Sequence, residues 1–97
     1  MNVIDEMIRT LKIKFPDAQI AITDESIHHA QHAQAQASGG GHFALRIISP
    51  RFKRMTLIDR HRLIHVTLQE FFDAKHIHAL AVKAFTPEEW QERGERE

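Results

Sequence analysis

The stretch TLIDRHRLIHVTLQEFFDAKHIHALAVKA, residues 56–84, combines a helical pattern with a strand pattern that follows it directly. Apolar residues recur at three- and four-residue steps over 56–73, which predicts one long helix packed on a sheet. The stripe consists of Leu57, His61, Ile64, Leu68 and Phe71. Residues 77–84 predict a strand that carries on one face His78, Leu80, Val82 and Ala84. A helix between two strands is typical of a crossover connection, so we expect this strand to run parallel to the one before the helix.

The patterns on either side complete the predicted fold. Residues 4–15 carry apolar side chains at helical spacing, and Pro16 ends the pattern. Residues 18–23 and 43–47 alternate as two strands that can pair antiparallel. Thr86, Pro87 and Glu89 have the spacing of a capping box, so we expect a short helix after them. The predicted fold class is α/β (α+β), in the order αββαβα, with a three-stranded mixed sheet covered by helices.

The composition limits what the chain can do. Its 97 residues, 42% of them hydrophobic, fit a single domain over 1–97, and no apolar run is long enough to cross a membrane. No secretory signal is recognised, so we expect a cytoplasmic protein that is a monomer or a weak homodimer alone. Thirteen basic and thirteen acidic residues cancel, although residues 91–97 form an acidic tail. Without a cysteine nucleophile or a phosphate-binding loop, we expect no enzymatic activity.

Histidine is the unusual residue of this sequence, with eight copies and no cysteine. Residues 24–41 form a long histidine-rich connection between the first two strands, and a compact domain seldom keeps such a loop without a use for it. A loop of this kind can also bind zinc or nickel adventitiously. From the residues alone, His78 is interpreted as a partly buried histidine bonded to backbone, and His42 and His61 are interpreted as structural.

Several short motifs in register resemble the BolA family from about residue 4 to residue 90. They are Asp24-Glu25-Ser26 with His29, His42-Phe43, Phe52, Arg60-His61-Arg62, His78-Ala79-Leu80, Thr86-Pro87 and Glu89-Trp90. The resemblance implies a fold similar to class II KH domains, which agrees with the element order predicted from the patterns. One departure is Arg54, where family members often have glycine, and it puts the geometry of that turn in question.

The resemblance also implies a function. Members of the family are adaptors that bind a monothiol glutaredoxin and share with it a two-iron two-sulfur cluster, so His78 and His29 are the expected ligands. His28 and His32 flank His29 and are the alternatives for the loop ligand. A chain without cysteine cannot supply the remaining ligands, which must come from the glutaredoxin cysteine and a bound glutathione. We therefore expect no cluster in the isolated chain.

A second function, DNA binding by a transcriptional regulator, is kept as the alternative because BolA proteins are also described as transcription factors. Five basic residues cluster in the sequence and could contact phosphates: Arg51, Lys53, Arg54, Arg60 and Arg62. We expect Arg60 and Arg62 to point away from the apolar stripe, toward a partner or phosphate. The GxxG loop by which KH domains clamp a nucleic-acid backbone does not occur, which weighs against direct binding.

Overall fold

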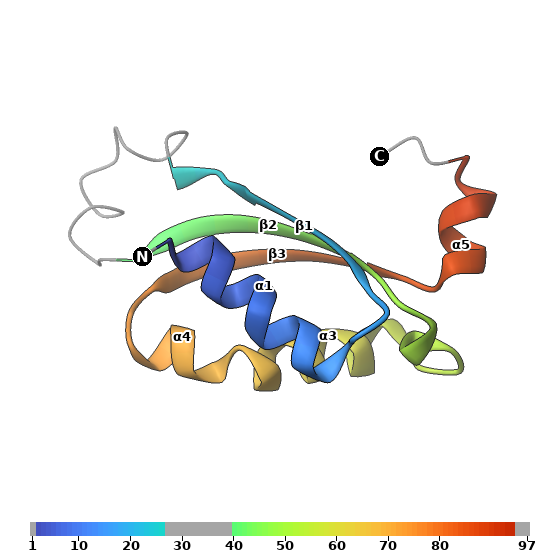
Figure 1. Cartoon of the computed structure of the whole chain (residues 1–97), viewed down its shortest axis with the longest axis horizontal. Coiled ribbons are helices and arrows are strands. Elements are labelled where there is room, and N and C mark those ends of the chain that lie inside the picture. The colour runs from blue at the N-terminus through green and yellow to red at the C-terminus, as the bar shows by residue number, and fades with distance from the viewer. Residues whose placement is uncertain (1, 27–39, 95–97) are drawn as a thin grey trace.

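The computed structural model describes residues 2–26 and 40–94 and shows a curved three-stranded sheet with helices packed against it (Figure 1). In chain order the elements are α1 (Val3–Lys14), β1 (Gln19–Asp24), β2 (Gly41–Ile48), the 3-10 turn η2 (Pro50–Phe52), α3 (Leu57–Thr67), α4 (Gln69–Asp73), β3 (Ile77–Phe85) and α5 (Pro87–Glu92). The predicted order of helices and strands is confirmed, with one helix divided in two. No helix in the described part of the chain is long and apolar enough to cross a membrane.

The sheet has the predicted mixed topology. Its strand order is β1-β2-β3, so β2 is central and β3 is an edge strand. β1 pairs antiparallel with β2, from Gln19 opposite Ile48 to Asp24 opposite Phe43. β2 pairs parallel with β3, up to Ile48 opposite Phe85. Because β2 and β3 are parallel, both strands begin at the same end of the sheet.

The core lies between one face of the sheet and α1, α3 and α4, which all cover that face (Figure 1). Alternate residues of the central strand enter it, namely Phe43, Leu45 and Ile47. The helices contribute Met7, Leu11, Ile64, Leu68 and Phe71. Burial of each such side chain contributes on the order of 1.5–3 kcal/mol, so this layer provides the main driving force for folding.

The short helix α5 lies at the other end of the molecule from the start of β3 (Figure 1). Its Trp90 packs against Phe85 with ring centroids 5.3 Å apart, and the Arg46 guanidinium lies 4.9 Å from the Trp90 ring. The predicted capping box is confirmed, since Thr86 and Glu89 exchange hydrogen bonds between side chain and backbone. Arg46 alternates with the core residues of β2, so α5 covers part of the sheet face that the other helices leave open.

The prediction of one helix over residues 56–73 is wrong, because the helix breaks at Leu68. Leu68 has φ −101° and ψ 15°, outside the α-helical values, and α4 starts after it. The hydroxyl group of Thr67 donates to the Leu63 carbonyl at 2.7 Å, a contact that bends helices. The break is compatible with burial of both Leu68 and Phe71, so the apolar stripe continues across it.

The predicted face of α3 is also wrong in its first two turns. Leu57 is 65% exposed and His61 is exposed, whereas Arg60 is only 5% exposed. Arg60 can be buried because its guanidinium group has a full set of acceptors. It donates to the carbonyls of Met55 and Ala84, both at 3.1 Å, and to the carboxylate of Glu89 at 2.6 and 3.0 Å. The guanidinium group therefore ties α3 to the end of β3 and to α5.

The ion pair changes the titration of Glu89. Hydrogen bonds from the Arg60 side chain, and then from the Thr86 backbone, lower the pKa of Glu89 from its ordinary 4.5 to about 2. A carboxyl group whose pKa is lower in the folded state stabilises the fold at pH values above its unfolded-state pKa. This stabilisation is lost as the pH falls toward the folded-state pKa. Acid should therefore loosen α5 from the end of the sheet.

We predict that Glu89→Gln lowers the free energy of unfolding by about 1–2 kcal/mol at pH 7, since it leaves Arg60 buried without a carboxylate partner. The value is at the low end for a buried pair because the Glu89 side chain is 42% exposed. Urea unfolding at several pH values checks it, with the exposed neighbour substitution Glu88→Gln as control. The difference from wild type should vanish between pH 4.5 and about pH 2. A constant difference across this pH range would contradict the role of the ionised Glu89 as the partner that stabilises Arg60.

Candidate metal-ligand site

His78 lies at the exposed start of the edge strand β3, beside an irregularity in the sheet. Gly41 pairs with Ile77, but the next residue of β2, His42, pairs with Ala79, so His78 is an extra residue in a β-bulge. Ile77 and Leu80 both pack in or against the core, while His78 and Ala79 between them are exposed. The prediction that His78 shares a face with Leu80 and Val82 is therefore wrong. The bulge turns this histidine out of the core and makes it accessible.

The ring of His42 lies next to the ring of His78, with centroids 5.0 Å apart and planes inclined by 49°. His42 is the second residue of β2 and His78 the second residue of β3, and the parallel pairing places these positions side by side. The sequence analysis interpreted His42 as structural and did not connect it with His78. The signal that could have found the pair was a histidine at the start of each of two strands predicted to be parallel.

Both ends of the segment 27–39 are attached to this part of the sheet. On one side, the backbone N–H of His42 donates to the Ser26 hydroxyl at 3.0 Å, and the Glu25 N–H donates to the His42 carbonyl at 2.7 Å. Hydrogen bonds from the Ser26 side chain and backbone connect Ser26 to Asp24, and they lower the pKa of the Asp24 carboxyl group. On the other side, the Gly41 N–H donates to the His76 carbonyl at 3.0 Å. The histidine-rich segment therefore leaves and re-enters the described structure beside His42 and His78.

The predicted loop ligand lies outside the described residues, as do its alternatives: His29, His28 and His32. Within residues 2–26 and 40–94, no group of three histidine, cysteine or acidic residues is arranged to hold a metal ion. The described site therefore offers one exposed imidazole with a second beside it, which is a partial donor set. Neutral imidazole is a suitable ligand for iron, zinc or copper, so the donor chemistry fits a metal centre completed by other ligands.

The basic cluster lies at the opposite end of the sheet, where β2 ends and α3 begins. Arg51, Lys53 and Arg54 are exposed in and after η2, and the Arg62 side chain is 75% exposed, 3.8 Å from Asp59. The prediction that Arg60 belongs to this surface is wrong, because Arg60 is buried and bonded as described above. Arg54 has φ +67°, so this turn keeps the left-handed conformation that favours glycine although arginine occupies it.

Comparison with known proteins finds one matching family and several similar proteins. The family described as BolA-like protein matches residues 11–89. SufE-like protein 1 of Arabidopsis thaliana is 37% identical over 81% of this chain, but the chain spans only 22% of that protein. A protein of Vibrio cholerae named DNA-binding transcriptional regulator BolA is 32% identical, over 91% of this chain and 78% of that protein. The solved structure of BolA1 from Arabidopsis thaliana is similar with a TM-score of 0.76 and 31% identity, over 92% of this chain and 96% of that one.

The backbone of Gly40 lies close to the start of β3, and we predict that Gly40→Ala disturbs this strand. Gly40 has φ +82°, and a Cβ atom there would lie 2.7 Å from the Lys75 carbonyl oxygen and 3.1 Å from the backbone nitrogen of His78. Backbone strain and crowding together should lower the free energy of unfolding by about 1–3 kcal/mol, measured by urea denaturation. Gly94→Ala is the control, because Gly94 also has positive φ at the other end of the described chain. Equal effects of the two substitutions would show that crowding of the Cβ atom at position 40 adds nothing to the backbone strain.

Proposed function

This chain belongs to the BolA family, and from that premise we propose that it is an adaptor that binds a monothiol glutaredoxin and supplies histidine nitrogen to a two-iron two-sulfur cluster held between the two proteins. In this role the chain takes part in the trafficking of such clusters or in regulation that responds to iron or stress. The role is one of binding, and no catalytic residue is assigned to it.

The observation that carries the proposal is the position of His78. This side chain is exposed on an edge strand, so a partner can approach it without unfolding any part of the sheet. The two anchored ends of the histidine-rich segment flank the same position. A second donor from this segment would therefore start from a point close to the first, and His29 remains the proposed second ligand, with His28 and His32 as its alternatives.

The chemistry of the donors supports a site shared between two proteins. The chain has no cysteine, so it cannot complete the coordination of two iron ions with its own residues. The thiolates would come from the glutaredoxin cysteine and from glutathione. Replacement of thiolate by neutral imidazole at one iron makes the cluster less negative and raises its reduction potential. The ring of His42 lies beside that of His78, and a side chain in this position is expected to help orient a ligand ring.

We predict that His78→Ala abolishes the spectral change that this chain causes when it joins a cluster-loaded monothiol glutaredoxin. At saturating concentrations of this chain, loss of a coordinating nitrogen alters the visible circular dichroism and absorption of the cluster, whereas loss of a surface contact changes only the concentration needed for saturation. The measurement is a titration of the glutaredoxin, reconstituted with iron, sulfide and glutathione, with each variant. His61→Ala is the matched control, because His61 is an exposed imidazole on α3. Wild-type spectra from His78→Ala would refute its assignment as a ligand.

DNA binding is the second candidate, favoured by the name of the Vibrio cholerae relative and by the exposed basic cluster of Arg51, Lys53, Arg54 and Arg62. Without Arg60 the cluster has four cations, so the log-log dependence of affinity on salt should have a slope of roughly minus 3.6 or less steep. The basic cluster and His78 lie at opposite ends of the sheet. The two activities, if both exist, are therefore separable by mutation.

For this candidate we predict that Lys53→Ala and Arg62→Ala each reduce the salt slope by about 1, while His78→Ala leaves it unchanged. Fluorescence anisotropy with a labelled DNA duplex at several salt concentrations measures the slope. Equal weak binding to unrelated duplexes would mean that the cluster acts only as a positive surface. A slope that does not respond to either substitution would remove the basic cluster from the interface.

A further inference from the structure

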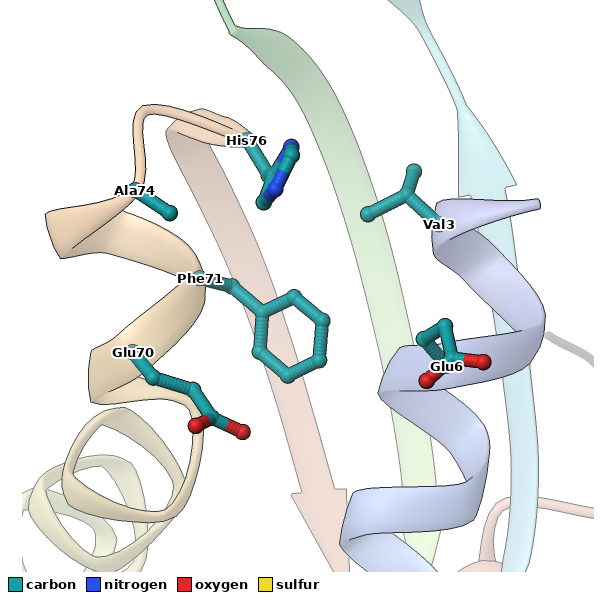
Figure 2. A pocket seen from close by; sticks show the side chains of 6 residues that line it. All are labelled: Val3, Glu6, Glu70, Phe71, Ala74 and His76. Carbon is teal, nitrogen blue, oxygen red and sulfur yellow. The ribbon is translucent and has the colours of Figure 1, made fainter. Parts of the chain in front are cut away.

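A cleft of about 420 Å³ opens between α1 and α4 at the end of the sheet where β3 begins. Figure 2 shows the ring of Phe71 between the two helices, with Val3 and Glu6 on the α1 side and Glu70 on the α4 side. Ala74 and His76 complete the lining, from the turn that leads into β3. Among the described residues, the lining includes neither His78 nor any member of the basic cluster.

The floor of the cleft is apolar and its rim is exposed. Phe71 is 8% exposed and belongs to the core, so its ring is held rigidly. Glu70, Ala74 and His76 are exposed, and Val3 is half-buried. This form suits a side chain that protrudes from another protein and lays an apolar stem on Phe71. An enclosed small molecule would need walls on all sides, which this open cleft does not provide.

The charges of the rim select the kind of side chain. Glu6 is already paired with Arg9, 2.8 Å away on α1. Among the described residues, the Glu70 carboxylate has neither an ion pair nor a side-chain hydrogen bond that would occupy it, so the cleft has an excess of negative charge. A carboxylate beside an aromatic floor is complementary to a guanidinium or ammonium group on an aliphatic stem. Anions would be repelled, and an apolar side chain would desolvate Glu70 without compensation.

We propose that this cleft receives an arginine or lysine side chain of the protein partner that docks at the His78 end of the sheet. His76 lines the cleft, and its carbonyl oxygen accepts the hydrogen bond from Gly41, opposite the bulge that carries His78. His78 and the cleft therefore lie at the same end of the sheet, where one docked protein can contact both. The inference rests on the proposed adaptor function for the identity of this partner, but the preference of the cleft for a cationic side chain is testable without it.

The direct test uses N-acetyl-arginine amide and the neutral isostere N-acetyl-citrulline amide as probes of the whole chain. Titrations followed by amide NMR shifts should show the arginine compound moving the signals of Val3, Phe71 and Ala74 at millimolar concentration. Citrulline amide should bind at least about threefold more weakly. Glu70→Gln should remove the difference between the probes, and Ala74→Leu should weaken both because it fills the cleft. Glu88→Gln, at the opposite end of the molecule, is the control for net charge. Equal shifts with both probes, or shifts outside the cleft only, would overturn the inference.

A second experiment tests the cleft with a monothiol glutaredoxin as the protein partner. Charge reversal by Glu70→Lys should weaken its binding by about three- to tenfold at low salt, with an unchanged cluster spectrum at saturation. Glu88→Lys should bind like wild type. If Glu70→Lys binds as tightly as wild type while His78→Ala still loses the spectral change, the cleft inference fails and the adaptor function stands. If the arginine probe binds as expected but His78→Ala keeps the wild-type spectrum, the cleft stands and the proposed role of His78 as a cluster ligand fails.

Discussion

The parallel pairing of β2 with β3 is the constraint from which the rest of the structure follows. Parallel neighbours require a crossover, and the crossover through α3 and α4 covers one face of the sheet with helices. The same pairing brings the starts of both strands to one end, so His42 and His78 meet although they lie far apart in the sequence. It also brings the strand ends together at the opposite side, where α5 packs on Phe85.

This arrangement gives the two ends of the molecule different surfaces. One end carries the histidine pair, both attachment points of the segment 27–39 and the cleft beside Phe71. The other carries the exposed cations around η2 and the ion pair between Arg60 and Glu89. Because the sheet separates them, a partner on one end leaves the other end accessible. The division would allow the two proposed activities, binding of a metal-carrying partner and binding of a nucleic acid, to be independent of each other.

Arg60 shows how a charged residue can belong to the interior. Its guanidinium carbon lies 5.8 Å from the centroid of the Phe52 ring, while its donors reach two carbonyl groups and a carboxylate. These acceptors come from a turn, a strand end and a short helix that are distant in sequence. A short helix such as α5 has little stability alone, and this ion pair supplies a contact that fixes it to the sheet.

The sequence by itself determined the order of the elements, the mixed sheet, the capping box at Thr86 and the alternation that buries Phe43, Leu45 and Ile47, because local spacing and capping chemistry encode these features. Only the tertiary structure decided that Arg60 is buried and His61 exposed, since the acceptors for the guanidinium group come from other elements. It also decided the bulge at His78, which reverses the face expected from simple alternation, and the contact of His78 with His42. The bulge and the histidine contact depend on the register between neighbouring strands, and no local pattern within one strand specifies that register.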